Sequence, residues 1–240
     1  MRTSGAAHNE HQRQYFSGRS LPRMDPVRRS ATPYTLRHVD ALVADAGIGP
    51  DDEVLDVGCG PGKYTVALAR RGIRVTGMDL TPRLVDQLRE VAPGIAAHVG
   101  DLAEPPADLI GTFDVVAGFF VLHHIADLPA AFAGARSLLR PGGRAAFVEP
   151  NPYFPGYYAQ VTFTPGMSWK GEAGIFRMRP RVMRGVAQAA GFTDFRTSRL
   201  GAFPPALANR ATGRRVEDLL ERVPGWRVAR AFSLFSMRVP

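Results

Sequence analysis

The chain has 240 residues, of which 45% are hydrophobic and 22% charged, which is typical of a globular protein with room for one α/β domain and additional segments. No apolar run approaches the ~20 residues of a membrane span, and residues 1–20 lack the apolar core of a signal peptide. Cys59 is the single cysteine, which excludes an intrachain disulfide and a cysteine-based metal cluster. We therefore expect a cytoplasmic protein without a membrane partner.

The net charge of +8 raises the question of a polyanionic partner. Nearly all of the positive charge is arginine, because lysine occurs only at Lys63 and Lys170. The arginines are scattered, and no basic helix with interleaved aromatic residues is present. This pattern favours a small-molecule substrate over nucleic acid. An anionic small molecule, an acidic carrier and a homodimer are left open.

Residues 1–34 are mostly polar and are expected to form an N-terminal extension, partly disordered or serving as a lid over substrate or cofactor. Residues 35–240 are expected to form one domain that opens with a helix over Thr35–Ala46. Strands and helices then alternate, which predicts a parallel sheet covered on both faces. The expected strands are Glu53–Val57, Arg74–Met78, Ile95–Val99, Phe113–Phe120 and Arg144–Val148. The expected helices between them are Lys63–Arg71, Pro82–Val91 and Pro129–Leu139.

Two inserts interrupt the second half of the chain, over residues 150–178 and 201–225, and both are expected on the substrate side. The first is rich in proline, glycine and aromatic residues, which suits a lid over a planar or hydrophobic substrate. The remaining expected elements are helices over Arg181–Ala190 and Arg215–Arg222 and strands over Phe192–Leu200 and Trp226–Val239.

The most informative segment is the run from Val54 to Lys63, where a buried strand ends in a turn with Gly58, Gly60 and Gly62. Such a turn lets a nucleoside-like ligand approach bare backbone. A dinucleotide-binding fingerprint needs its third glycine at the position of Lys63, so that alternative is disfavoured. Asp56 inside the strand end also disfavours a pyrophosphate. The ligand is therefore expected to lack phosphate and to carry positive charge.

Two further carboxylates follow the next strands. Asp79 ends the second strand, about twenty residues beyond the turn, where a carboxylate can bind both ribose hydroxyls. Asp101 follows the third strand, where it can accept a bond from an exocyclic amine while the Leu102 amide faces a ring nitrogen. Three strand ends thus offer carboxylates to one crevice.

Taken together, these segments resemble the class I S-adenosylmethionine (SAM)-dependent methyltransferases, over roughly residues 35–150. The matching motifs are Val54-Leu55-Asp56-Val57-Gly58-Cys59-Gly60-Pro61-Gly62, Gly77-Met78-Asp79-Leu80, Gly100-Asp101-Leu102, Phe113-Asp114-Val115-Val116 with Leu122-His123-His124-Ile125, and Leu139-Arg140-Pro141-Gly142-Gly143. The resemblance implies a three-layer αβα sandwich around a seven-stranded, mostly parallel sheet of order 3-2-1-4-5-7-6 with strand 7 antiparallel. An N-terminal helical extension and a lid insert after strand 5 would complete it.

The resemblance also implies which residues hold SAM, and later its product S-adenosylhomocysteine. Gly58 and Gly60 would contact the methionine part, and Asp56 would orient its ammonium group. Asp79 would hold the ribose diol. The other residues implied for the cofactor site are Gly62 in the turn, Leu80 after Asp79, Asp101 and Leu102 at the adenine, Phe119 beside the methionine, and Tyr15 at its carboxylate.

The methyl group of SAM is already activated for transfer, so the protein mainly has to align SAM with the acceptor and exclude water. A hydroxyl acceptor benefits from a base, and His123 or His124 after the fourth strand suits that role. Asn151-Pro152-Tyr153 is similar to the turn of amide-directed N-methyltransferases, but it follows the fifth strand and lacks the second proline. No metal site is expected.

We therefore expect a SAM-dependent methyltransferase that acts on a hydroxyl of a small molecule, a bacterial secondary metabolite. The alternatives left open are N- or C-methylation, a non-methylating cyclisation or decarboxylation with bound SAM, and a non-catalytic SAM-binding partner.

Overall fold

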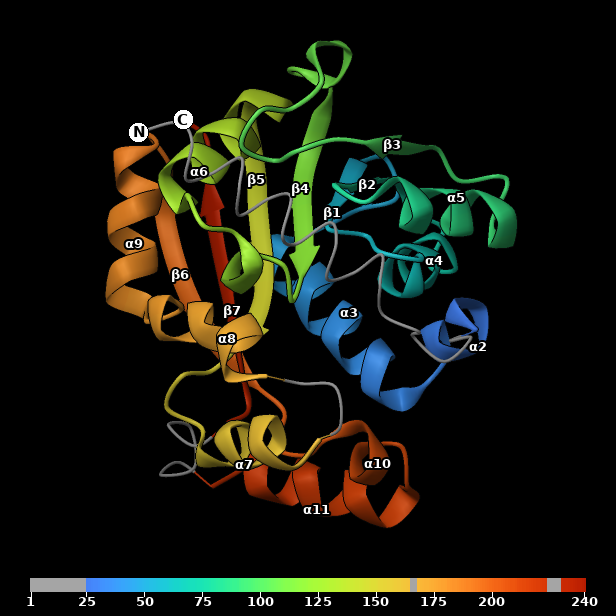
Figure 1. Cartoon of the computed structure of the whole chain (residues 1–240), viewed down its shortest axis with the longest axis vertical. Helices are drawn as coiled ribbons and strands as arrows, with labels where there is room; N and C mark the ends of the chain where they lie inside the picture. Colours follow the sequence, from blue (N-terminus) through green and yellow to red (C-terminus); the bar gives the residue numbers. More distant parts are fainter. Residues whose placement is uncertain (1–24, 165–167, 224–229) are drawn as a thin grey trace.

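The computed structural model describes residues 25–164, 168–223 and 230–240, which contain a seven-stranded sheet of order β3-β2-β1-β4-β5-β7-β6 (Figure 1). The pairs from β3 to β5 are parallel, and β7 is antiparallel to both β5 and β6. Both the order and the antiparallel strand are as expected. The strands are β1 (Glu53–Val57), β2 (Arg74–Asp79), β3 (Ala97–Val99), β4 (Phe113–Phe119), β5 (Leu139–Pro150), β6 (Thr193–Leu200) and β7 (Phe232–Arg238).

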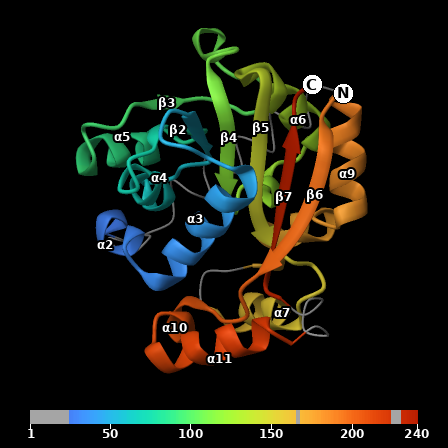
Figure 2. The ribbon, with the colours of Figure 1, turned by 180° about the vertical axis from the view of Figure 1, so that it is seen from behind.

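Helices cover both faces of this sheet (Figures 1 and 2). One core cluster joins α3 (Pro33–Ala46) and α4 (Lys63–Ala69) to Val115 of β4. The other joins α6 (Leu128–Leu138) and α9 (Pro180–Ala189) to Val116, the next residue of the same strand. Because successive side chains of a strand point to opposite faces, an uninterrupted apolar strand builds both cores. The expected αβα sandwich is confirmed.

Helix α5 (Pro82–Val91) packs beside α4 and the strands β2 and β3. Three short helices complete the main body: α2 (Pro26–Ser30), η1 (Ala107–Leu109) and η2 (Leu122–His124). None of the helices in the described ranges is long and apolar enough to span a membrane.

Helix α3 runs against the direction of the parallel strands. Behind its last turn, Gly47 accepts a hydrogen bond from Arg144, near the start of the pairing between β5 and β4. Its first turns lie at the other edge, where His38 contacts the rings of Phe120, after β4, and Phe232, at the start of β7. The beginning of α3 therefore lies at the carboxyl-terminal edge of the sheet, the edge at which open α/β sheets bind ligands.

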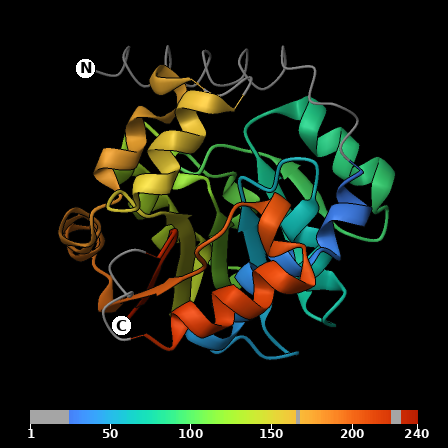
Figure 3. The same cartoon turned by 90° about the horizontal axis from the view of Figure 1, so that it is seen from below.

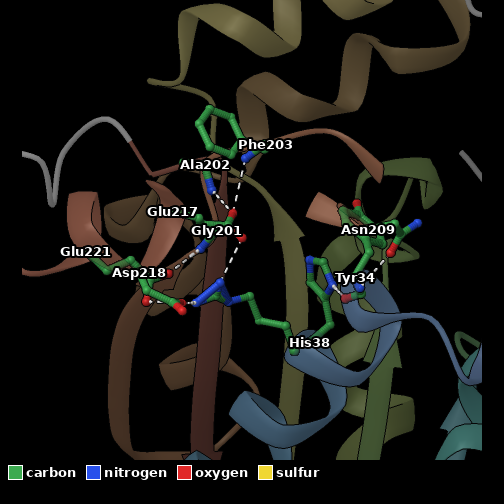
Figure 4. A network of polar contacts seen from close by, with 10 residues as sticks. Tyr34, His38, Gly201, Ala202, Phe203, Asn209, Glu217, Asp218 and Glu221 are labelled. Atoms are coloured by element: carbon green, nitrogen blue, oxygen red, sulfur yellow. Dashed lines mark hydrogen bonds and ion pairs between the residues drawn. The ribbon is translucent and has the colours of Figure 1, made fainter. Parts of the chain in front are cut away.

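The two inserts also lie at this edge (lower part of Figure 1, and Figure 3 from below). The first contains α7 (Pro155–Phe163), α8 (Trp169–Glu172) and η3 (Ala173–Arg177), and the second contains α10 (Pro205–Ala208) and α11 (Ala211–Glu221). Glu217 of α11 is buried and accepts hydrogen bonds from the amides of Ala202 and Phe203, while Arg37 of α3 donates to it at 2.7 Å (Figure 4). This network holds the second insert against the beginning of α3.

Some element boundaries differ from the sequence prediction. Strand β5 begins at Leu139 rather than Arg144 and continues through Pro150, so Glu149 is a strand residue. The helix expected from Arg215 begins at Ala211, and the helices α2, α7, α8 and α10 had no expected counterpart. Strand β7 begins at Phe232 rather than Trp226, and residues 226–229 of the expected strand lie outside the described residues.

Candidate active site

The glycine turn after β1 has the left-handed backbone that only glycine adopts readily. The φ angles of Gly58, Gly60 and Gly62 are 67°, 53° and 98°. A Cβ atom on Gly58 would lie 2.4 Å from a methyl of Val121, and one on Gly62 would lie 2.4 Å from a methyl of Leu88. A Cβ atom on Gly60 would meet no heavy atom of the described residues within 4 Å. The outer two glycines thus allow close packing, whereas Gly60 presents bare backbone to open space.

The amides of this turn are already engaged within the protein. Gly58 donates to the carbonyl of Met78 at 2.8 Å, and Gly62 donates to the carbonyl of Cys59 at 3.0 Å. Gly60 donates to Oδ2 of Asp79 at 2.9 Å. A phosphate-binding loop needs such amides for its ligand. The geometry therefore supports the expectation that the ligand lacks phosphate.

Two carboxylates lie beside the turn. Asp79, at the end of β2, also accepts the Thr81 amide on Oδ1 at 2.8 Å; burial raises its pKa while these amide bonds lower it. Asp56 is 1% exposed and accepts a hydrogen bond from the hydroxyl of Thr65 at 2.7 Å. Burial raises the pKa of Asp56 to about 7. Concentrated carboxylates at one edge suit a ligand with a positive charge and hydroxyl groups.

Two more of the expected cofactor residues follow β3. The half-buried Asp101 accepts the amide of Ala103 on Oδ1 at 2.9 Å, so its side chain also shapes the local turn. The side chain of Leu102 belongs to the core beneath α6, and its carbonyl oxygen packs against Gly134 of that helix. Leu80, after β2, is half-buried.

A buried cluster of titratable groups lies after β4. Nδ1 of His123 lies 2.6 Å from Oε2 of Glu149, and its Nε2 lies 3.4 Å from Oε2 of Glu172. Oε1 of Glu149 accepts the amides of Val121 and Leu122. The hydroxyl of Tyr157 donates to Oε2 of Glu172 at 2.5 Å. We call His123, Glu149, Glu172 and Tyr157 the His123 cluster.

The charges in this cluster act on one another. Burial alone lowers the pKa of His123, but the carboxylates of Glu149 and Glu172 outweigh it and raise the pKa to about 9. Burial likewise raises the pKa of Glu172, and hydrogen bonding and attraction to His123 reverse this and lower it to about 2. His123 is therefore an imidazolium at neutral pH, with each nitrogen facing a carboxylate.

The ring of His124 lies against that of His123, with centroids 3.9 Å apart. One ligand atom from each of His123, His124 and Glu172 lies within 4.8 Å of the others, a grouping that could hold a metal ion. This grouping could not be predicted from the sequence, because Glu172 lies in an insert without a motif.

Comparison with known proteins agrees with this geometry. A family model described as a methyltransferase domain matches residues 54–143. The ubiquinone biosynthesis O-methyltransferase of Pseudomonas entomophila is 30% identical over 196 residues, which cover 78% of this chain and 73% of that protein. The chain belongs to the class I SAM-dependent methyltransferases.

Other matches to this methyltransferase are shorter or more distant. The ubiquinone biosynthesis O-methyltransferase of Xanthomonas axonopodis pv. citri is 36% identical over 116 residues, 47% of each chain. The match thus spans about half the length of many of the curated relatives. The solved structure of a SAM-dependent methyltransferase from Thermotoga maritima superposes with a TM-score of 0.63, covering 97% of this chain and 95% of that one at 16% identity, which shows a common fold.

The site of the methyltransferase fits SAM, the cofactor of its family. The open space at Gly60 admits a ligand, and Asp79 is held beside it by the amide of Gly60 on Oδ2 and the amide of Thr81 on Oδ1. Asp56, at the end of β1, lies two positions before Gly58. Bound SAM supplies a methyl group on a sulfonium, already activated for displacement by a nucleophile.

The structure places the other predicted site residues in different surroundings. Phe119 is buried and stacks on the ring of Tyr64, with centroids 4.2 Å apart and planes at 8°. Tyr15 lies outside the described residues. The sequence analysis did not predict that Glu172 and Tyr157 belong to the His123 cluster. It also did not predict the backbone of Phe120, whose φ of 60° is rare for a bulky residue and has no signal in the sequence.

Proposed function

We propose that this methyltransferase moves the methyl group of SAM to a hydroxyl group of a small molecule. The observation that carries the proposal is the glycine turn, open at Gly60, with Asp56 and Asp79 beside it. The choice of oxygen is supported by the relative from Pseudomonas entomophila, which is named an O-methyltransferase. Within this proposal the acceptor is a bacterial secondary metabolite, and the enzyme acts in the cytoplasm.

The acceptor hydroxyl must lose its proton as its oxygen bonds to the methyl carbon. His123 suits this role poorly at neutral pH, because both of its nitrogens face carboxylates and it is already protonated. Its neighbour His124 is half-buried and packs on the same ring. We therefore assign proton transfer to His124, and to His123 the task of holding the turn after β4 in position.

The first insert supports an apolar acceptor. Tyr158 and Trp169 stack with centroids 5.9 Å apart, and Phe176 lies 6.1 Å from Tyr158. Trp169 and Phe176 are each 46% exposed, so this aromatic group retains surface for a ligand. In this proposal the insert covers the acceptor and excludes water during transfer.

The test begins with calorimetry of SAM and S-adenosylhomocysteine on the full chain. The protein is then incubated with methyl-labelled SAM and a panel of phenols, amines and metabolites of neighbouring genes, and products are identified by mass spectrometry. Label on oxygen supports the proposal, whereas label on nitrogen or carbon selects those alternatives. Binding without transfer to any acceptor points to a non-methylating or non-catalytic role, and absence of SAM binding refutes the proposal.

A further inference from the structure

His38 of α3 is a buried histidine that the proposed transfer does not use. Its imidazole is 1% exposed, and Nδ1 lies 2.7 Å from the backbone carbonyl oxygen of Tyr34 (Figure 4). A carbonyl oxygen only accepts hydrogen bonds, so Nδ1 carries the hydrogen. Nε2 therefore presents a lone pair to its surroundings.

That lone pair has no hydrogen-bond partner among the described residues, and neither has the buried hydroxyl of Tyr64 on α4. A buried polar atom without a partner costs stability and is uncommon in native proteins. Phenylalanine at either position would avoid this cost. Two such atoms in one cluster indicate that a ligand or a water supplies the missing partner.

The side chains that surround Nε2 of His38 and the hydroxyl of Tyr64 are aromatic. The ring of His38 lies 4.4 Å from that of Tyr34, 4.6 Å from that of Phe232, 5.4 Å from that of Phe120 and 6.2 Å from that of Tyr64. Tyr34 and Phe120 are half-buried, whereas the other rings are buried. The cluster therefore meets solvent on the side of Tyr34 and Phe120. The rings of Phe232, Phe120 and Tyr64 meet that of His38 edge-on and the ring of Tyr34 is tilted to it, and such arrangements suit a flat aromatic ligand.

The cluster lies next to the cofactor turn. Tyr64 is the second residue of α4, two positions after Gly62, and burial together with the charges of Tyr34 and Asp56 raises the pKa of its hydroxyl. Phe120 follows the last residue of β4, in the turn that leads to His123, and its φ is 60°. Strained backbone of this kind gathers at ligand sites. Position and strain together place the aromatic cluster at the edge where the acceptor must lie.

The charges around the cluster favour an uncharged ligand. Burial, together with the positive charges of Lys63 and Arg37, lowers the pKa of His38 to about 3, so the imidazole is neutral. Nζ of Lys63 lies 4.1 Å from the ring centroid of Tyr64 and 5.8 Å from that of Tyr34. A cationic acceptor would meet this ammonium group, and an anionic one would meet the lone pair of Nε2.

We propose that His38, Tyr64 and Phe120 form the acceptor subsite, in which a hydroxyl of a neutral phenol other than the one that is methylated donates to Nε2 of His38 while the phenol ring lies against Phe120. This inference rests on the proposed function and names its substrate class. His38 acts here as a positioning and specificity-determining residue.

Calorimetry tests the proposal on the full chain saturated with S-adenosylhomocysteine. The probes are catechol, phenol and anisole, in which the hydroxyl hydrogen of phenol is replaced by a methyl group. His38→Phe should weaken phenol and catechol about 10-fold, the effect of one buried hydrogen bond, and leave anisole unchanged. In protein with ¹⁵N-labelled histidine, phenol should shift the unprotonated Nε2 resonance that His38→Phe removes. Leu219→Ala, at a side chain 65% exposed on α11, is the control.

Equal weakening of phenol and anisole, or an Nε2 resonance that no probe shifts, would overturn the proposal and leave a resident water as the partner of His38. If His38→Phe does not fold, the ¹⁵N titration of the unaltered protein provides the same test. Failure to bind S-adenosylhomocysteine contradicts the proposed function instead. If S-adenosylhomocysteine binds but phenol gives neither calorimetric binding nor a shift of the Nε2 resonance, only this inference is contradicted.

Discussion

Nδ1 of His123 lies 2.6 Å from Oε2 of Glu149, and this buried contact ties the turn after β4 to the end of β5. The other oxygen of Glu149 accepts the amides of Val121 and Leu122, at 2.9 and 2.7 Å. The carboxylate of Glu149 thus holds the imidazole of His123 and the two amides in place. The turn that contains them contacts the glycine turn through Val121 and the first insert through His123. Because the pair is buried, its charge state should affect the stability of the whole domain.

The first prediction concerns pH. The pKa of His123 is about 9 in the folded protein, where burial is outweighed by Glu149 and Glu172, and about 6.5 when unfolded. A raised folded pKa means that the stabilisation is fully present below pH 6.5 and is lost as pH rises through 9. We expect chemical denaturation to show that this contribution, about 3 kcal/mol, disappears across that window.

The control for this prediction compares the pH dependence of stability in the unaltered chain with that in the variant His123→Gln. Asp56 and Lys63 also titrate differently in the folded protein, so the pH profile of the unaltered chain mixes several groups. Subtracting the profile of His123→Gln isolates the histidine. A difference between the unaltered chain and His123→Gln that does not depend on pH would contradict a charged His123.

The second prediction concerns Asp79. Asp79→Asn should weaken SAM binding by roughly 10- to 100-fold, because charge-assisted hydrogen bonds to the ribose are replaced by weaker ones. Asp79→Ala should weaken it further, since it also removes the acceptor of the Gly60 and Thr81 amides. Calorimetry measures both, and Asp86→Asn on the exposed face of α5 is the control. Unchanged affinity in Asp79→Ala would rule out the ribose assignment.

The third prediction separates packing from ligand contact in the glycine turn. Gly60→Ala and Gly72→Ala both place a Cβ on left-handed backbone with no heavy atom of the described residues within 4 Å. Each should cost about 1–2 kcal/mol of stability, but Gly60→Ala alone should weaken S-adenosylhomocysteine. Gly58→Ala should cost more, because its Cβ meets Val121 at 2.4 Å. Equal affinity in the Gly60 and Gly72 variants would show that the ligand does not approach Gly60.

Local patterns predicted most of this fold, and they failed where function depends on distant contacts. The strand over Glu53–Val57 and the helix over Pro82–Val91 match the structure residue for residue, because apolar periodicity and the glycine and proline signals coincide there. The position of Asp79 beside the glycine turn could be predicted, because strand ends meet at one edge. The contacts of Glu172 and His38 could not, since they arise from packing of an insert and of α3 against the end of β4, which no spacing in the sequence records.

The last prediction concerns metal. His123, His124 and Glu172 present ligand atoms within 4.8 Å of one another, yet a metal at Nε2 of His123 must displace the proton that faces Glu172, on a ring whose pKa the carboxylates of Glu149 and Glu172 raise to about 9. Chelation with EDTA should therefore leave SAM affinity and turnover unchanged at pH 7. Cobalt(II) added at that pH should give no ligand-field absorption from this site, and Glu172→Gln serves as the comparison. If activity is lost with EDTA and restored by zinc or magnesium, then His123, His124 and Glu172 form a metal site and the prediction is wrong.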